Sequence, residues 1–513
     1  MRKTNRLLIF LSIFLSIILL PLKSYALSND NNEINQLSAN DRLKIEEFID
    51  KQMEKGKIPG MSVVVVQGDK TIYQKGLGYS DIKNQKPVTS KSLFELCSNS
   101  KAFTALGILN LQKNRLIKLD DPAIKYIPWL KMKYQGKVAL ITIEELLYQT
   151  SGIPERTINK IPISNDDKAL EETVKTLINV ELDSEPGKRF QYATINYDVL
   201  GLIIEKVAGV TYEKYLEENI IKPMGLNNTY LYKNETVNEY MAQGYKIEFL
   251  KPRLYDAPVY RGNKPAGYII SNAEDMAKWL KIQMGTFDGS KFNKDLIKDS
   301  HKPKEELDSG SYYASGWYVH AKDDVVIYHP GGNPNYSSFI VYNPEKKIGV
   351  AVLSNINSSY VSAIGDGIYG ILQGKDYNRD IMDSNKSADA ISILIICITN
   401  LILLITLYFM LKTFKQILRK ERKYHKKDIK SIFKIGFSLI FIIGLSCCLY
   451  LIPYIFKGVS WEFVYIWFPK SIKIALYFTY TSIWVLYIYL FIISFYKKVA
   501  KIEIERINNS YKL

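Results

Sequence analysis

Phe94-Glu95-Leu96-Cys97-Ser98-Asn99-Ser100-Lys101-Ala102-Phe103-Thr104 places a serine hydroxyl and a lysine amine three residues apart at the start of a predicted helix. This spacing brings Ser98 and Lys101 to one face of the helix. The free N–H groups of its first turn favour negative charge near Ser98. A buried lysine loses its proton readily, because desolvation disfavours the charged form. The pair could therefore supply a nucleophile and its base, although such spacings also occur on solvated helix faces.

A second motif, Tyr192-Ala193-Thr194, lies 94 residues downstream of Ser98. It follows the turn Glu185-Pro186-Gly187 and precedes a predicted apolar helix, 197–207. A phenol held near an ammonium group can have a lowered pKa and act as a general base. A packed core tyrosine is the alternative, since the chain has 37 tyrosines.

A third motif, His329-Pro330-Gly331-Gly332, lies 137 residues beyond Tyr192, at the end of a predicted strand. Glycines at this place let a substrate backbone approach the strand and leave an N–H group exposed. A plain turn before the next strand is the alternative.

Together, and in this order, the three motifs resemble those of the serine β-lactamase and penicillin-binding protein superfamily, in its class C-like branch. Two further stretches are similar to segments common in that branch: Leu146-Leu147-Tyr148-Gln149-Thr150-Ser151-Gly152-Ile153-Pro154 and Pro265-Ala266-Gly267-Tyr268-Ile269-Ile270-Ser271. The resemblance covers about residues 41–375. It implies an α/β fold in which helices flank an antiparallel sheet and form a helical subdomain.

The resemblance also implies a role for each matching residue. Ser98 would be the acylated nucleophile, and Lys101 and Tyr192 would pass its proton to the leaving group. The backbone N–H groups of Ser98 and Gly332 would form the oxyanion hole. Glu95 would orient this region, with a purely structural role as the alternative. No cofactor or metal is implied, and the four histidines show no paired ligand spacing.

Within the superfamily, the chain looks most like the membrane-anchored peptidases that mature colibactin- and xenocoumacin-type prodrugs by removing an N-acyl-D-asparagine cap. In that group a hydroxyl residue matching Thr194 and an amide matching Asn333 hold the D-Asn side chain. His329 matches the third motif in the form that many class C-like relatives use. A buried site that pairs an amide rejects residues without one. One departure stands against this interpretation: the group has a histidine where this chain has Tyr260-Arg261-Gly262-Asn263.

Two other functions stay open. The first is a penicillin-binding D-Ala-D-Ala carboxypeptidase or a β-lactamase-like hydrolase that acts on the cell wall. The second, from a different class, is a noncatalytic membrane receptor or immunity protein that kept the fold. The expected partners are a small peptide or acyl-peptide substrate and membrane lipid, with a transporter as a further possibility.

Hydrophobic periodicity supports one domain built from both ends of the chain. It predicts strands at 61–67, 70–76, 325–329, 337–342 and 348–353, with helices at 41–55 and 358–373. The middle, about 95–320, is mainly helical, with a capping box at Thr142 and Glu145 and another cap at Ser271 and Glu274. A cleft between sheet and helical insertion is the expected place for a site.

The net charge of +16 is concentrated outside this domain. Residues 412–431 hold nine basic and two acidic residues, whereas residues 27–411 are nearly neutral. The basic excess therefore belongs to membrane and targeting segments, and a nucleic-acid partner is not expected. Cys97 is the single cysteine of the globular part, so an internal disulfide there is excluded.

The two ends of the chain indicate export and membrane insertion. Residues 1–26 have the basic start, apolar core and small residues of a signal peptide, with an uncleaved anchor helix as the alternative. Three apolar runs are long enough to span a bilayer. The positive-inside rule places the basic loop and the tail in the cytoplasm and the hydrolase domain outside, in the cytoplasmic membrane. The predicted segments are a signal peptide at 1–26, the hydrolase domain at 27–378, a linker at 379–389, membrane helices at 390–411, 432–456 and 471–496, a cytoplasmic loop at 412–431, an outer loop at 457–470 and a cytoplasmic tail at 497–513.

Overall fold

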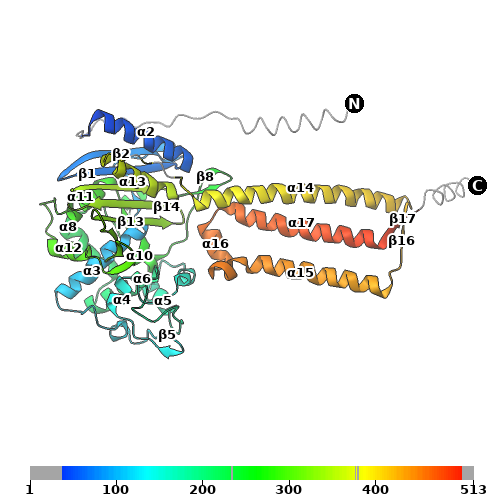
Figure 1. The fold of residues 1–513 in the computed structure, drawn as a ribbon, viewed down its shortest axis with the longest axis horizontal. Coiled ribbons are helices and arrows are strands. Elements are labelled where there is room, and N and C mark those ends of the chain that lie inside the picture. The colour runs from blue at the N-terminus through cyan, green and yellow to red at the C-terminus, as the bar shows by residue number, and fades with distance from the viewer. Residues whose placement is uncertain (1–36, 233–234, 376, 378–379, 500–513) are drawn as a thin grey trace, which may run out of the picture.

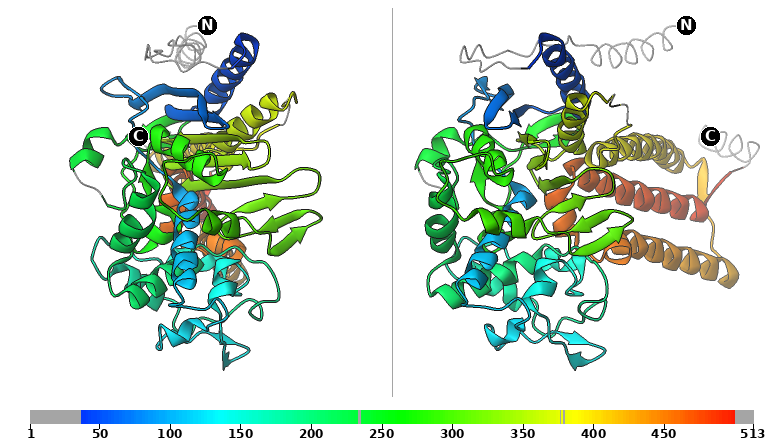
Figure 2. Two further views of the ribbon diagram at one scale, coloured as in Figure 1. Left: turned by 90° about the vertical axis from the view of Figure 1, so that its left-hand side faces the viewer. Right: turned by 60° about the vertical axis from the view of Figure 1, so that its left-hand side comes forward.

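The computed structural model describes residues 37–232, 235–375, 377 and 380–499. The predicted signal peptide and nearly all of the predicted tail lie outside these ranges. A mixed α/β domain occupies one end of the molecule, and three long helices leave it in the same direction (Figures 1 and 2).

A nine-stranded sheet in the order β10-β11-β12-β13-β14-β15-β1-β2-β3 forms the centre of the domain. All of its neighbouring strands are antiparallel, and the first and last parts of the hydrolase domain meet where Val63 pairs with Val352. This confirms the sheet expected from both ends of the chain. Its strands are β1 (Gly60–Gln67), β2 (Lys70–Asp81), β3 (Lys86–Pro87), β10 (Glu305–Asp308), β11 (Ser311–Tyr313), β12 (Tyr318–His320), β13 (Val326–Asn333), β14 (Tyr336–Asn343) and β15 (Ile348–Ser354).

Strand β1 is buried on both faces, as its continuous run of valines suggests. Successive side chains point to opposite faces, so Val63 and Val65 pack toward helices α2 (Ala39–Gly56) and α13 (Ser359–Leu372). Val64 and Val66 pack into the larger core on the other face.

The larger core holds helix α3 (Ser100–Lys113), which carries the predicted lysine and is buried over most of its length. The ring of Phe103 stacks on Trp279 with centroids 3.9 Å apart, which joins α3 to α11 (Ala273–Gln283). The other helices of the insertion are α4 (Ile143–Leu147), α5 (Ala169–Lys175), α6 (Ile195–Ala208), α7 (Tyr212–Leu216), α8 (Lys222–Met224), α9 (Glu235–Tyr240), α10 (Lys264–Gly267) and α12 (Lys294–Ser300). Its short strands are β4 (Phe94–Glu95), β5 (Lys133–Tyr134), β6 (Lys137–Val138), β7 (Tyr245–Glu248), β8 (Lys251–Leu254) and β9 (Ile270–Ser271).

One of the two predicted helix caps is confirmed, and the other is wrong by one residue. Thr142 and Glu145 form the complete capping box that the sequence predicts for α4. The cap predicted at Ser271 is wrong by one residue, because Ser271 belongs to β9. The extended Asn272 caps α11 instead and accepts a hydrogen bond from the backbone N–H of Asp275.

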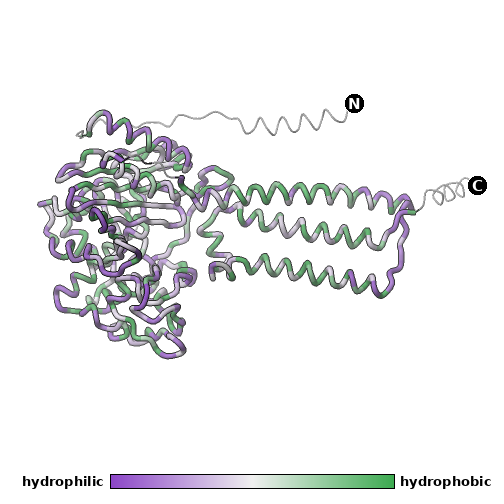
Figure 3. Tube along the Cα trace, viewed as in Figure 1, coloured by the Kyte–Doolittle hydropathy of each residue, from purple (hydrophilic) through white to green (hydrophobic). Residues whose placement is uncertain are grey.

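Three helices at the end of the chain are long and apolar enough to cross a membrane: α14 (Ser384–Leu418), α15 (Ile429–Lys457) and α17 (Lys470–Phe495). They overlap the three predicted spans, and Figure 3 shows that hydrophobic residues predominate along them, with hydrophilic residues at the end away from the hydrolase domain. A hydrogen bond from the Ser482 hydroxyl to the Thr399 carbonyl (2.8 Å) joins α17 to α14.

Three connecting segments have more structure than the sequence suggested. The predicted linker is helical from Ser384 onward, as the first part of α14. The predicted outer loop contains a short helix, α16 (Trp461–Trp467). In the basic loop, β16 (Arg422–Tyr424) pairs with β17 (Tyr496–Lys498).

Candidate active site

The Ser98 side chain projects from a 3-10 turn, Cys97–Asn99, that connects β4 to α3. The α-helix begins at Ser100, two residues later than predicted. Cys97 has a φ of 49°, an unfavourable left-handed conformation for a residue with a side chain. The hydroxyl of Ser338 on β14 donates to the Leu96 carbonyl (2.6 Å) and accepts from Asn99 (2.8 Å). Strand β14 therefore holds the turn on both sides of the half-buried Ser98.

Lys101 is fully buried, and its amine has three hydrogen-bonding neighbours. Its Nζ lies 3.2 Å from Ser98 Oγ, 3.1 Å from Thr194 Oγ1 and 2.7 Å from the Ala266 carbonyl oxygen. A carbonyl oxygen can only accept. A neutral amine can therefore donate to Ala266 and Thr194 and still accept the proton of the Ser98 hydroxyl.

The electrostatic surroundings favour this neutral form of Lys101. Burial lowers the pKa of Lys101 to about 7, and the charge of Asp198 opposes that shift. Asp198 lies on α6 and is fully buried, and burial raises the pKa of its carboxyl group. With its amide nitrogen turned toward this carboxyl group, Asn263 donates to both oxygens, at 2.9 and 3.1 Å.

Sequence reasoning missed Asp198. Asp198 at the start of the predicted apolar helix 197–207 was the available signal, because an acid in such a run is rarely buried without a partner.

Tyr192 lies on the other side of Ser98. Lys101 Nζ is 5.2 Å from the centre of the Tyr192 ring, and the Tyr192 hydroxyl has a hydrogen bond with Ser98. The lowered pKa expected for this phenol is not found. Burial raises the pKa of Tyr192 and outweighs the hydrogen bond with Ser98. Tyr192 is therefore a neutral phenol that can receive or release a proton only as part of a relay.

The sequence predicts that the strand ends at the third motif. In the structure, strand β13 continues through the motif to Asn333. Proline is tolerated there because β12 pairs only with the strand up to Tyr328, so Pro330 needs no N–H on that side. A Cβ on Gly331 would lie 2.4 Å from Ser338 Oγ and 2.8 Å from Cys97 Cβ. Only glycine at position 331 lets the strand lie this close to the turn that carries Ser98.

His329 is a neutral ring in this structure. Its Nδ1 lies 2.7 Å from the Pro330 carbonyl oxygen, so Nδ1 carries the hydrogen and Nε2 is an acceptor. Burial lowers the pKa of His329 to about 3, and the charge of Lys101 acts in the same direction. Nε2 is buried, and none of the residues that the structure describes forms a hydrogen bond with it.

These groups surround a cavity of about 330 Å³. Ser98, Tyr192, His329 and Gly332 all line it, together with Tyr318, which sequence reasoning missed. No motif marks Tyr318; its ring packs 5.3 Å from His329. The three predicted motifs thus converge on one cavity, and both residues predicted to form the oxyanion hole border it.

The predicted specificity residues have partners within the protein. Thr194 accepts the hydrogen bond from Lys101, which leaves its own hydrogen available. Asn333 is buried, and its amide nitrogen donates to Glu95 Oε2 (2.6 Å) and to the Gly267 carbonyl (2.8 Å). Glu95 and Asn333 therefore join β4, β13 and α10 close to the turn that carries Ser98.

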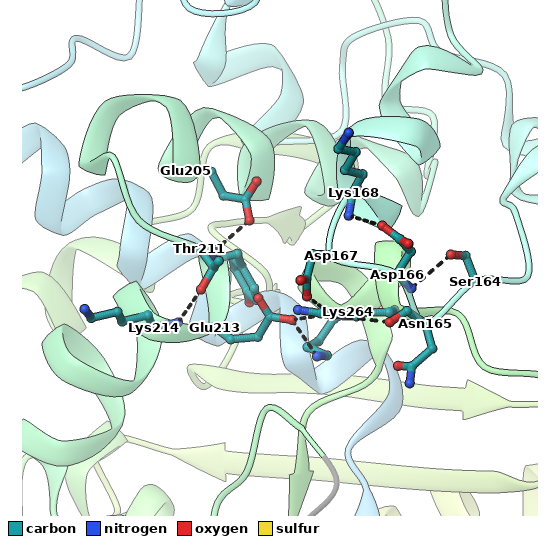
Figure 4. Close-up of polar contacts among 12 residues, drawn as sticks. Ser164, Asn165, Asp166, Asp167, Lys168, Glu205, Thr211, Glu213, Lys214 and Lys264 are labelled. Carbon is teal, nitrogen blue, oxygen red and sulfur yellow. Dashed lines mark hydrogen bonds and ion pairs between the residues drawn. The ribbon is translucent and has the colours of Figure 1, made fainter.

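A larger cavity of about 1020 Å³ begins at Glu95 and extends along the helical insertion. Glu213 on its wall pairs with Lys264 (2.7 Å) and with Arg261 (3.1 Å), as Figure 4 shows for Lys264. Arg261 also pairs with Asp167. Arg261 therefore belongs to an ion-pair network. It lies in the segment 260–263, which lacks the histidine expected from the resemblance to the prodrug-activating peptidases.

The described part of the chain contains no group of three or more His, Cys, Asp or Glu side chains arranged to hold a metal ion.

Comparison with known proteins gives a consistent result. The Beta-lactamase family model matches residues 45–375. Protein flp of Staphylococcus aureus (strain MRSA252) is 31% identical over 446 residues, which cover 86% of this chain and 88% of that protein. Penicillin-binding protein 4* of Bacillus subtilis (strain 168) is 26% identical and covers 69% and 81% of the two chains. The solved octameric penicillin-binding protein homologue from Pyrococcus abyssi has a TM-score of 0.60 and 30% identity, and the match covers 69% of this chain and 81% of that one.

Proposed function

Because this chain belongs to the beta-lactamase family and is a serine hydrolase of that family, we propose that it cleaves an amide or ester at a membrane surface through an acyl-enzyme on Ser98. The observation that carries the proposal is the buried Lys101 amine, 3.2 Å from Ser98 Oγ, with a pKa lowered to about 7. At neutral pH a large fraction of this amine is free to accept the serine proton.

In the proposed reaction, Ser98 Oγ attacks the substrate carbonyl carbon and its proton passes to Lys101. The N–H groups of Ser98 and Gly332 stabilise the negative oxygen of the tetrahedral intermediate. The proton then reaches the leaving nitrogen or oxygen through Tyr192, whose neutral phenol releases one proton as it receives another. A water molecule hydrolyses the acyl-enzyme by the reverse sequence of proton transfers, which regenerates Ser98.

For the substrate we propose an N-acyl-D-asparagine cap on a nonribosomal peptide prodrug. The resemblance to the prodrug-activating peptidases supports this choice, as does the hydroxyl hydrogen of Thr194, which remains available when its oxygen accepts from Lys101. Thr194 can donate this hydrogen to the oxygen of a substrate side-chain amide.

A penicillin-binding D-Ala-D-Ala carboxypeptidase is the second candidate, and two observations favour it. The chain is similar to penicillin-binding protein 4* and to the Pyrococcus homologue over most of the hydrolase domain. In addition, Arg261 is committed to Glu213 and Asp167. The sequence has Tyr260-Arg261-Gly262-Asn263 where the prodrug-activating group has a histidine, so this feature of that group is missing.

The two candidates are separated by substrate and by inhibitor. The full chain in detergent would be incubated with an N-myristoyl-D-asparaginyl amide, its L-isomer, a D-Ala-D-Ala peptide and a fluorescent penicillin, with Ser98→Ala as control. Selective turnover of the D-asparaginyl amide supports prodrug activation. Turnover of D-Ala-D-Ala with penicillin labelling of Ser98 supports the carboxypeptidase. Failure of Ser98 to react with any acylating probe refutes hydrolysis altogether and favours a noncatalytic receptor.

We further propose that α14, α15 and α17 span the cytoplasmic membrane with the hydrolase domain outside. Their length and hydropathy support this, as does the basic segment between α14 and α15, which the positive-inside rule places in the cytoplasm. Cysteine labelling with a membrane-impermeant reagent tests it: Leu43→Cys would react in intact cells, whereas Lys423→Cys would react only after permeabilisation.

A further inference from the structure

The β7–β8 hairpin ends in a turn with an unusual sequence. Glu248 pairs with Lys251, so Phe249 and Leu250 form the complete two-residue turn. Their φ angles are 51° and 58°. Two-residue turns with positive φ at both positions strongly favour Asn-Gly, because bulky apolar residues are strained there. A hairpin that only had to reverse the chain would be more stable with Asn-Gly.

A carboxylate from the membrane helices holds this turn. Asp389 of α14 is fully buried and accepts hydrogen bonds from the backbone N–H groups of Phe249 (3.0 Å) and Leu250 (2.6 Å). Ser471, in the first turn of α17, donates to the same carboxylate (2.5 Å). Hydrogen bonds to a charged acceptor are strong, so they help to offset the strain of the turn.

These contacts fix the position of the turn along the helices. Asp389 directly precedes the apolar run that starts at residue 390, and Ser471 begins the run at 471–496. Figure 1 shows the hairpin beside the end of α14 that meets the hydrolase domain. The turn therefore lies at the level where α14 and α17 become apolar.

The side chains of the hairpin match this level. Phe249, Leu250 and Leu254 are 42%, 43% and 62% exposed, although each is large and apolar. Lys251 and Arg253 are exposed beside them. Apolar side chains next to basic ones are typical of surfaces that bind anionic membranes.

We infer that the tip of the β7–β8 hairpin inserts Phe249 and Leu250 into the outer leaflet of an anionic phospholipid bilayer, with Lys251 and Arg253 at the level of the lipid phosphates. The inference rests on the proposed location of α14 and α17 in the membrane. The hairpin and the helices together would fix the orientation of the hydrolase domain, and hence of its active site, against the bilayer.

Quenching of a fluorescent label tests the inference in the full chain, reconstituted in phosphatidylglycerol-containing nanodiscs. Single accessible cysteines would carry an NBD group, with Cys397, Cys447 and Cys448 otherwise replaced by alanine and the buried Cys97 retained. Labels at Phe249→Cys and, as a second position on the hairpin, Leu254→Cys are compared in nanodiscs with and without a shallow doxyl-labelled lipid. Insertion by about 5–10 Å predicts loss of roughly half or more of the emission at position 249.

Two references make the result decisive. Retained Cys397, exposed on α14, reports the membrane span itself. Leu43→Cys, exposed on α2, reports the water-facing domain: it lies about 18 Å along the helix from Lys55, which contacts α14 through Lys386. Quenching at 249 and 397 but not at 43 supports the inference. Quenching at 397 alone overturns it and leaves the span intact, whereas no quenching at 397 overturns the span as well.

A matched variant separates side-chain insertion from turn geometry. F249N/L250G keeps residues that favour the turn and removes both apolar side chains. With the label at Leu254→Cys, this variant should lose at least half of the quenching seen with the native turn. Unchanged quenching at position 254 would mean that Phe249 and Leu250 do not hold the hairpin in lipid.

Discussion

Lys101 Nζ lies 3.2 Å from Ser98 Oγ, within reach of a direct proton transfer. Because burial lowers the pKa of Lys101 to about 7, its amine must lose a proton before it can act as a base. The rate of Ser98 acylation should therefore rise about tenfold per pH unit below pH 7 and level off above it. Lys101→Met should reduce acylation by about 10²- to 10⁴-fold at pH 8. Stopped-flow labelling with a fluorescent acylating probe measures both; a flat profile from pH 5 to 8 would contradict this role.

The same pKa predicts how stability depends on pH. The unfolded chain keeps the Lys101 proton up to about pH 10.5, whereas the folded chain releases it near pH 7. Between these values the unfolded state binds more protons, so the free energy of unfolding rises with pH in this window. Thermal melting at pH 7 and pH 9.5 should show a larger increase in Tm for the wild type than for Lys101→Met.

Asp198 should set the position of the acidic limb of the rate profile. Its charge raises the pKa of Lys101, so Asp198→Asn should shift the limb to lower pH. Glu205→Gln, on the same helix but bonded to the Tyr212 N–H, is the matched control. Coincident profiles for Asp198→Asn and the wild type would show that Asp198 is already neutral when Lys101 titrates.

Tyr192→Phe should slow acylation by about 10²-fold or more while the protein stays folded, because a proton relay is lost and no backbone contact changes. Burial raises the pKa of Tyr192, so the wild-type rate should not fall through ionisation of this phenol up to pH 10. Single-turnover labelling measures the loss of the proton relay, and thermal melting shows whether the variant is still folded. A lower Tm would mean that the slower acylation reflects a damaged fold.

The two glycines of the third motif should respond differently to alanine. A Cβ at Gly331 would lie 2.4 Å from Ser338 Oγ, whereas at Gly332 the nearest atom is 3.4 Å away. Gly331→Ala should therefore displace the nucleophile turn and lower both Tm and labelling rate. Gly332→Ala keeps its backbone N–H and should retain the wild-type Tm. Equal Tm losses in the two variants would contradict the close contact at Gly331.

Lys246 should control the docking of the hydrolase domain on α16. It is buried, and its Nζ donates to the carbonyls of Tyr465 (3.0 Å) and Ile466 (2.8 Å). Lys246→Met would leave both carbonyls without this donor, so α16 should exchange its amide hydrogens faster, with exposed Lys251→Met as control. Because burial lowers the pKa of Lys246 to about 8, wild-type exchange, corrected for intrinsic rates, should also increase above pH 8.

Most of the sheet could be predicted from the sequence, because β1, β14 and β15 are long and strongly apolar. The strands β10, β11 and β12 were missed. They are three or four residues long, and tyrosines such as Tyr313 and Tyr318 give no clear alternation. The end of β13 was misplaced because Pro330 normally stops a strand, and only the short partner β12 makes it acceptable.

The site was predictable to the extent that its chemistry lies in short motifs. Ser98, Lys101 and Tyr192 belong to such motifs and meet around one cavity. Asp198 and Asn263 act through burial and through contacts between distant segments; an acid in an apolar run can suggest burial, but no local pattern identifies its partner. The direction of the Tyr192 pKa shift was missed for the same reason, since it depends on how deeply the fold buries the ring.

The pairing of β1 with β15 has a consequence for biogenesis. During synthesis the β1–β2 hairpin has an unsatisfied edge until nearly 300 further residues have followed, because Met61 pairs with Ser354. Contacts of such long range form slowly, and an exposed edge invites aggregation in the meantime. Ser338, which is hydrogen-bonded to the turn that carries Ser98, also comes late in the hydrolase domain. A ribosome-bound fragment that ends before β14 should thus be inert toward acylating probes. Ser98 would become reactive only once β14 and β15 have joined the β1–β2 hairpin.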